Sequence, residues 1–292
     1  MHIHGAVDVV LRELVSHHPA TAAPAKLHLG VSLLACPVFA DPPACSGLPS
    51  HGKLRNALIS AVSTFNGGLG FNMWGTLVAN DGTVCAVAFS GGSYTDQWFG
   101  SRVISAQKAN TANGFSLSAI APPPTANLFK MGLALSTANL YSAVQPGGSL
   151  YGLQHSNPVD TTAAYPQGNA ILFGTAQDPM VGSRIGGVNV FGGGLALYTG
   201  GEKVGGLGVS GDTSCTDHNV AWRVRNALGL DKFGEVGADG GMAGDVDHPD
   251  NIIFDIKPNP DGGTGISAGG FGHPTCPNSA SFDVTTLPTV TH

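Results

Sequence analysis

The sequence predicts an α+β fold in which an antiparallel sheet is covered by helices. Two stretches of apolar residues each fold back on themselves at a glycine-containing turn, which is typical of β-hairpins. Each hairpin ends in a Ser-Gly turn and is followed by a segment whose apolar residues recur at helical spacing. Because hairpins pair antiparallel strands, this repeated order favours a layered α+β fold over a doubly wound parallel sheet.

The first hairpin is expected between residues 76 and 89. Its strands, 76–79 and 83–89, flank Asn80-Asp81-Gly82, and Asp-Gly between two apolar runs is a strong short-range hairpin signal. The second strand is apolar on both faces as far as Ser90-Gly91-Gly92. This pattern indicates that helices or neighbouring subunits cover both sides of the sheet.

The second hairpin is expected between residues 189 and 209. Residues 189–191 lead through Gly192-Gly193-Gly194 to a strand at 195–198, and after a turn at 199–202 the chain returns along 203–209. Glycines inside a strand remove side chains, so something must pack closely there. A helix, a ligand or a neighbouring subunit could fill this role.

Three helices are expected, at about 50–65, 101–115 and 214–228, from the spacing of their apolar residues. The middle helix carries small residues along one side, which let a sheet or another helix approach closely: Ala106, Ala109 and Ala112. In the last helix, Ser214 followed by Asp217 resembles a capping box. An aspartate there can accept backbone N–H bonds, and a catalytic role is the alternative.

The stretch between the two halves, residues 118–187, is irregular and rich in Gly, Pro, Ser and Asn. A connection of this length is uncommon inside a domain and is usually functional or interface-forming. We expect an ordered insertion with a short helix near 135–144. The tail, 234–292, is rich in Gly, Pro and Asp, with one strand-like segment at 251–256. Residues 41–292 are expected to form a single domain.

The composition excludes one class of partner and favours self-association. The net charge is −6, and the 13 Lys and Arg residues form no basic run, which argues against nucleic-acid binding. Charged residues make up only 11% of the chain, against about 25% in an average soluble domain. A monomer with so little charge would expose much neutral surface, so we expect a homo-oligomer. No apolar stretch reaches the roughly 18 residues that a membrane span needs.

Residues 1–40 end in a stretch that resembles a signal peptide. Lys26 precedes an apolar run, 27–40, which closes with the small-x-small sequence Val38-Phe39-Ala40. Cleavage at this point would release a periplasmic or secreted protein. The alternative is that the run is an ordinary helix or strand.

The cysteine count supports export. The chain has 5 cysteines; cleavage after Ala40 would remove Cys36 and leave an even number, which permits two disulfides in three connectivities. The remaining four are Cys45, Cys85, Cys215 and Cys276. We expect Cys45–Cys85 with Cys215–Cys276, although a buried free Cys85 is an alternative. No spacing is C-x-x-C, so a zinc ribbon or a thioredoxin motif is not expected.

Two segments resemble motifs of the GlcG/HbpS-like haem-binding family. Residues 101–116, SRVISAQKANTANGFS, resemble its helix motif, with Lys-Ala-x-Thr-Ala at 108–112. Residues 192–221, GGGLALYTGGEKVGGLGVSGDTSCTDHNVA, resemble its C-terminal hairpin and helix. The matching residues of the second segment are Gly193, Gly194, Leu195, Gly205, Gly208, Val209, Ser210, Gly211, Asp217 and Ala221.

This resemblance implies a profilin-like, three-layer α+β fold with a five-stranded antiparallel sheet flanked by helices. It also implies an oligomer that binds haem or another tetrapyrrole and is linked to iron or redox handling. The insertion at 118–187, the N-terminal segment and the tail depart from the family's pattern.

Haem binding requires an apolar slot, a cation or donor for the propionates and often an axial histidine. His218, Trp222 and Arg225 lie in one row of the last expected helix. They could supply the metal ligand, a stacking plane and a propionate partner, or could simply form a partly exposed helix face. His51, at the start of the first helix, is a second candidate ligand. The other histidines considered are His155, His248, His273 and His292.

Lys108 and Arg102, on the middle helix, could each neutralise a carboxylate of the ligand or could have a structural role. The Ser-Gly turns before the helices could bind anions through backbone N–H groups, or could serve only the fold. Ser210, Asp217 and His218 do not form a convincing nucleophile set. The prediction is therefore an exported, oligomeric haem- or tetrapyrrole-binding protein. The alternatives are a structural oligomer without ligand and an enzyme acting on a small organic acid.

Overall fold

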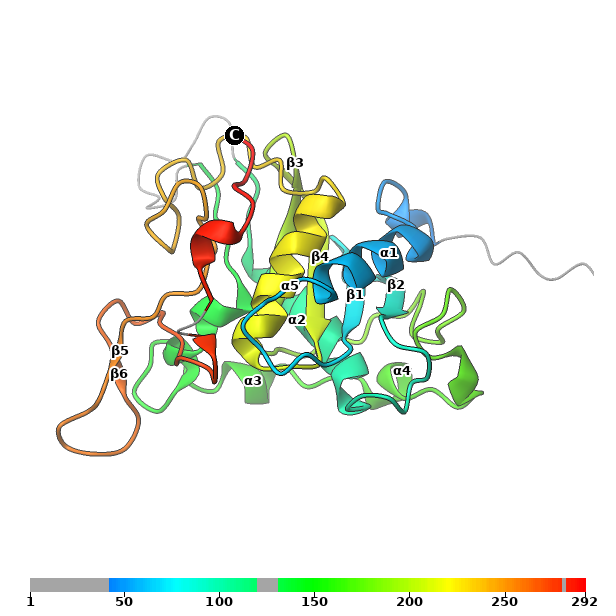
Figure 1. The fold of residues 1–292 in the computed structure, drawn as a ribbon, viewed down its shortest axis with the longest axis horizontal. Helices are drawn as coiled ribbons and strands as arrows, with labels where there is room; N and C mark the ends of the chain where they lie inside the picture. The colour runs from blue at the N-terminus through cyan, green and yellow to red at the C-terminus, as the bar shows by residue number, and fades with distance from the viewer. Residues whose placement is uncertain (1–41, 120–130, 280–281) are drawn as a thin grey trace, which may run out of the picture. The chain divides into compact units, whose positions relative to one another are not determined.

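In the computed structural model, four strands form an antiparallel sheet in the order β2-β1-β4-β3 (Figure 1). The strands are β1 (Trp74–Ala79), β2 (Val84–Phe89), β3 (Gly194–Thr199) and β4 (Glu202–Ser210). Both predicted hairpins are therefore confirmed, and β1 and β4 pair with each other along the centre of the sheet. Five strands were expected, and this number is wrong for the described main sheet. The only other strands among the described residues form a separate two-stranded ladder, β5 (Ile256–Lys257) with β6 (Ile266–Ser267).

The structure describes residues 42–119, 131–279 and 282–292, which belong to one compact unit, Phe39–His292. The expected signal peptide and Cys36 lie outside the described residues, so they stay predictions. Within the described residues, no helix is long and apolar enough to cross a membrane.

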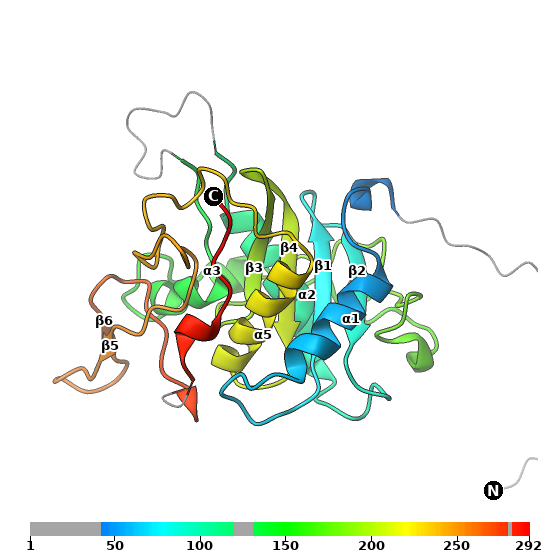
Figure 2. The same ribbon diagram turned by 45° about the horizontal axis from the view of Figure 1, so that its top comes forward.

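Helices cover both faces of the sheet, as Figure 2 shows. α1 (His51–Val62) and α5 (Ser214–Ala227) pack against each other and against one face, while α2 (Gly100–Phe115) packs against β4, β1 and β3 on the other. The main apolar core lies between the sheet and the α1–α5 pair, and includes Leu58 and Trp222. The predicted α+β class, with helices flanking an antiparallel sheet, is confirmed.

The glycines of β4 bring α2 into contact with the backbone of the sheet. A Cβ atom built on Gly208 would lie 1.9 Å from the carbonyl oxygen of Ser105, and one built on Gly206 would lie 2.2 Å from that of Ala109. Neither distance is possible between real atoms, so only glycine fits at these two positions. The sequence left open whether a helix, a ligand or a neighbouring subunit packs against these glycines. In the structure it is a helix, α2.

The insertion consists of loops with short helical turns. The predicted helix near 135–144 is present as two 3₁₀ turns, η2 (Thr137–Leu140) and η3 (Ser142–Val144). Three further turns follow: α3 (Leu153–Ser156), α4 (Thr161–Ala164) and η4 (Ala170–Leu172). Two more 3₁₀ turns among the described residues are η1 (Pro43–Cys45) and η6 (Val284–Thr286). The strand expected at 251–256 is wrong except for Ile256, because the preceding residues form no ladder.

Two disulfides join distant parts of the chain, and both have the predicted connectivity. Cys45–Cys85 ties η1 to β2, with the Cα atoms 5.4 Å apart. Cys215–Cys276 ties the first turn of α5 to the tail, with the Cα atoms 6.0 Å apart. The alternative of a free, buried Cys85 is thereby excluded.

The start of α5 differs from the expected capping box. The N-cap residue is Thr213, whose side chain accepts the backbone N–H of Thr216, and Ser214 is already the first helical residue. Asp217 lies one position too late to cap the helix. Its carboxylate instead accepts the backbone N–H of Asp212 at 2.9 Å and faces α2.

Candidate functional site

Lys108 and Asp217 form a fully buried ion pair between α2 and α5. The amine donates to a carboxylate oxygen of Asp217 at 2.6 Å and to the carbonyl of Val209 at 3.1 Å. Gly193 makes room for it, because a Cβ there would lie 3.0 Å from the Lys108 amine and 2.4 Å from the Val209 carbonyl. The contact with Val209 is the structural role that the sequence left open for this lysine.

Burial dominates the titration of this pair. It lowers the pKa of Lys108 and raises the pKa of Asp217 to about 6, while the attraction between the two groups opposes both shifts. The attraction between the two touching groups therefore favours their charged forms, against the cost of burial. Because the Lys108 side chain is fully buried, a ligand carboxylate could reach it only if the surrounding layers separated.

Arg102 and Arg225 are held in the same way. Arg102 donates to Asp178 in a bidentate pair, with Nε 2.9 Å from one oxygen, and Nη1 bonds the carbonyl of Ala164 at 3.0 Å. Arg225 pairs with Asp250 through bonds of 2.6 and 2.9 Å. All four side chains are fully buried. These arginines are thus already neutralised within the fold.

The row of His218, Trp222 and Arg225 exists, but it lies inside the protein. The His218 and Trp222 rings are 5.9 Å apart, and the Arg225 guanidinium lies 4.4 Å from the centre of the Trp222 ring. His218 is fully buried, and neither of its ring nitrogens has a hydrogen-bond partner among the described residues. Burial first, then the charge of Arg225, lowers the pKa of His218 to about 3, against a smaller opposing effect of the Asn251 side chain.

An open pocket of about 400 Å³ lies elsewhere, at the Ser-Gly turn after β2. We call it the aromatic pocket, since Phe89, Tyr94 and Phe173 line it together with Arg55. Its other lining residues are Gly91, Gly92, Ser93, Ile171, Gly174 and Thr175. The Tyr94 and Phe173 rings meet edge to face at 5.7 Å.

The buried pair of Arg102 and Asp178 does not line this pocket but supports Phe173, which does. The Arg102 guanidinium lies 4.2 Å from the centre of the Phe173 ring. Asp178 accepts the backbone N–H groups of Gly174 at 2.8 Å and Met180 at 2.9 Å, which fixes the loop that carries Phe173. Arg102 and Asp178 thus hold Phe173 and its loop in place.

One residue of α1, Arg55, lines the aromatic pocket, and a second, His51, lies beside it. The Arg55 side chain is half-buried and donates to the carbonyl of Gly91 at 3.4 Å. It makes no ion pair with another described residue. His51, one turn earlier, bonds the carbonyl of Gly174 through Nε2 at 2.9 Å. Because Gly174 lines the pocket, its bonding partner His51 lies beside the pocket. Lys108, His218 and Arg225 are not among the lining residues.

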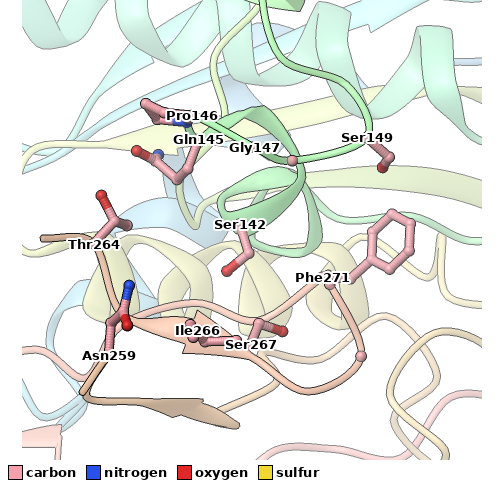
Figure 3. Close-up of a pocket in the computed structure, with 14 residues that line it drawn as sticks. Ser142, Gln145, Pro146, Gly147, Ser149, Asn259, Thr264, Ile266, Ser267 and Phe271 are labelled. Carbon is pink, nitrogen blue, oxygen red and sulfur yellow. The ribbon is translucent and has the colours of Figure 1, made fainter. Parts of the chain in front are cut away.

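Two further pockets hold none of the predicted residues. One, of about 460 Å³, has walls from η3 with its following loop and from the β5–β6 ladder (Figure 3). Its lining mixes polar side chains, such as Gln145 and Asn259, with apolar ones, such as Ile266, and Phe271 is its single aromatic side chain. The other, of about 500 Å³, shares Phe271 and adds Met242. Neither pocket combines several rings with a cation.

Sequence reasoning missed Arg55, Tyr94 and Phe173. Arg55 could have been found, because it lies four residues after His51 on a helix that the apolar spacing predicts. Tyr94 and Phe173 lie in loops without periodicity, and no local signal brings them together.

No protein-family model and no curated protein matches the chain. Among solved structures, the chain is similar to "Crystal Structure of PduOC:Heme Complex", with 23% identity and a TM-score of 0.39, over 60% of this chain and 89% of that one. It is also similar to Klebsiella pneumoniae protein ORFY, of family model DUF336. That match has 21% identity and a TM-score of 0.38, over 61% of this chain and 86% of that one.

Proposed function

We propose that the protein binds haem, or another flat tetrapyrrole with acidic side chains, in the aromatic pocket. The observation that carries the proposal is the combination of three aromatic rings with Arg55 in one open pocket of about 400 Å³. Pockets for small ligands are typically a few hundred Å³ in volume, apolar on their walls and supplied with few polar groups. A tetrapyrrole needs this combination, because its ring is apolar and its propionates are anionic.

The residues present fit haem at this place better than in the interior. Phe89, Tyr94 and Phe173 offer ring faces and edges, and Arg55 offers a guanidinium that is free to pair with a propionate. His51 lies beside the pocket and would be the axial ligand after giving up its bond to Gly174. When bound, haem would supply a redox-active iron.

The roles first assigned to His218, Lys108 and Arg225 would require the layers of the fold to separate. Each of these side chains is fully buried, and each of the two cations already faces a carboxylate. Breaking such a pair costs about 3–5 kcal/mol. For this reason we place the ligand at Arg55 and His51, and we give the interior groups a structural role.

Self-association and export remain parts of the proposal. Large apolar side chains at the pocket are exposed, including Ile171 at 70%, which lines it, and Phe99 at 38%, whose ring stacks on Phe173. Contiguous exposed apolar surface favours a covering partner, and a second copy of the chain fits the low surface charge. The two disulfides favour an oxidising compartment such as the periplasm or the cell exterior.

Titration of the purified chain with hemin, read by absorbance, tests the proposal. We expect a Soret band that saturates, with affinity lowered roughly tenfold or more in Arg55→Ala because a charge-assisted hydrogen bond is lost. His51→Ala should shift the band. Lys53→Ala, an exposed lysine on the same helix, is the matched control and should change neither.

Two outcomes would contradict the proposal. One is the absence of a saturable Soret band in the wild-type chain. The other is a band that His218→Leu removes while Arg55→Ala and His51→Ala leave it unchanged, since this would place the ligand in the interior. If large symmetric assemblies form without hemin affinity, the structural-oligomer alternative holds instead.

A further inference from the structure

A second group of donor atoms lies at the start of α5, apart from the aromatic pocket. The sulfur atoms of Cys215 and Cys276 and one ring nitrogen of His273 lie within 4.8 Å of one another. Sulfur and imidazole nitrogen are the donors that zinc and similar divalent metals prefer. Among the described residues, this is the only such group of three.

His273 has the hydrogen-bonding arrangement of a metal-binding histidine. Its side chain is buried, with the residue only 1% exposed, and Nδ1 lies 2.7 Å from the carbonyl oxygen of Pro274. A carbonyl only accepts, so Nδ1 carries the proton and Nε2 has the free lone pair. Nε2 has no hydrogen-bond partner among the described residues. A backbone carbonyl that holds one ring nitrogen commonly orients the other toward a metal.

The surroundings of Cys276 would stabilise a thiolate. Its sulfur receives the backbone N–H of Cys215 at 3.2 Å and lies 3.5 Å from the hydroxyl of Ser214. Both donors belong to the first turn of α5, where the helix dipole favours negative charge. Cys276 is half-buried between the exposed residues Thr275 and Pro277, so this end of the disulfide lies nearer to solvent than the buried Cys215 and is where a reductant would approach.

We propose that reduction of Cys215–Cys276 by a dithiol creates a zinc site whose ligands are the two sulfurs and His273. The dithiol gives two electrons and two protons to the disulfide, which becomes two thiols, while the dithiol is oxidised to its own disulfide. Zn²⁺ then displaces the two thiol protons and forms two Zn–S bonds and one Zn–N bond. A water molecule completes the four-coordinate sphere.

The distances permit this change with small side-chain movements. Zinc lies about 2.3 Å from sulfur and 2.0–2.1 Å from imidazole nitrogen, so tetrahedral ligand atoms are spaced by roughly 3.5–4 Å. One ring nitrogen of His273 is already within 4.8 Å of both sulfurs, and rotation of the ring can adjust the position of Nε2. The two Cα atoms, 6.0 Å apart, leave room for the sulfurs to separate by rotation of the cysteine side chains.

The other disulfide provides an internal control. Cys45–Cys85 has no third donor of this kind beside it among the described residues. In the experiment, the chain is reduced with dithiothreitol, freed of it under nitrogen, and alkylated with iodoacetamide with or without ZnCl₂. Mass spectrometry then measures the alkylation rate at each cysteine separately.

We expect zinc to slow alkylation of Cys215 and Cys276 on the order of tenfold or more, and to leave Cys45 and Cys85 unchanged. His273→Ala should lose this protection, whereas His155→Ala, an exposed histidine of the insertion, should keep it. Absence of protection, equal protection of all four cysteines, or protection that survives His273→Ala would overturn the proposal.

Unfolding of the reduced chain does not prevent the test, because circular dichroism records it. If the reduced chain unfolds, the proposed site predicts that zinc restores the native signal in wild type and not in His273→Ala. A reduced chain that zinc neither protects nor refolds would show that no such site exists.

Discussion

Replacing Gly208 by alanine tests whether the sheet and α2 are in backbone contact. The new methyl carbon would lie 1.9 Å from the Ser105 carbonyl oxygen and 2.5 Å from the Ala109 nitrogen. Both atoms belong to the backbone of α2, so no side-chain rotation relieves the clash and the helix must move. Overpacking of a core costs about 1–3 kcal/mol. For a unit of this size, we expect the melting temperature to fall by roughly 2–12 °C.

Gly114→Ala is the matched control for this substitution. Gly114 lies in α2 as well, is exposed, and has no neighbouring atom within 4 Å of a built Cβ. Alanine favours helix over glycine by up to about 1 kcal/mol, so this variant should be as stable as wild type or more stable. Thermal unfolding of both variants, followed by circular dichroism, gives the comparison. If Gly208→Ala melts at or above the wild-type temperature, α2 does not contact β4 in this way.

Two further predictions concern the interior. Lys108→Met should lower the free energy of unfolding by about 3–5 kcal/mol, because it leaves the carboxyl of Asp217 buried without its partner. Adding Asp217→Leu to this variant should recover part of the loss, and denaturant titrations of both variants measure it. His218 has a folded-state pKa of about 3 against 6.5 in the unfolded chain, so its contribution to stability is complete above pH 6.5 and is lost as the pH falls toward 3. Between pH 7 and 4.5 this loss is about 3 kcal/mol. Over that range, His218→Leu should therefore lose less stability than wild type by about this amount. If both proteins lose the same stability, the ring of His218 is not buried in its neutral form.

Local patterns were sufficient to predict the strands and the long helices. The Asp-Gly turn before Thr83 and the apolar spacing in α1, α2 and α5 act over a few residues, and each segment formed as expected. The strand count and the strand at 251–256 were wrong for a different reason. A strand requires a ladder partner, and the residues before Ile256 have none in the structure.

The candidate site was harder to predict because burial is a property of the whole fold. His218, Trp222 and Arg225 were correctly placed on one side of a helix, yet the spacing along the helix does not show whether that side faces solvent or the tail. Arg225 is covered because Asp250, 25 residues later, returns to pair with it. Residues so far apart carry no joint signal in a single sequence.

The buried cations also explain the unusual surface of the molecule. The chain has 13 lysines and arginines, and Arg102, Lys108 and Arg225 are enclosed with their carboxylate partners. The surface therefore has even less charge than the 11% content suggests. A surface poor in charge and rich in exposed rings around the aromatic pocket is suited to contact with a flat ligand or a second copy of the chain. Among these buried cations Arg102 positions Phe173 in the pocket wall, and Arg55 is the cation that the proposed ligand would meet.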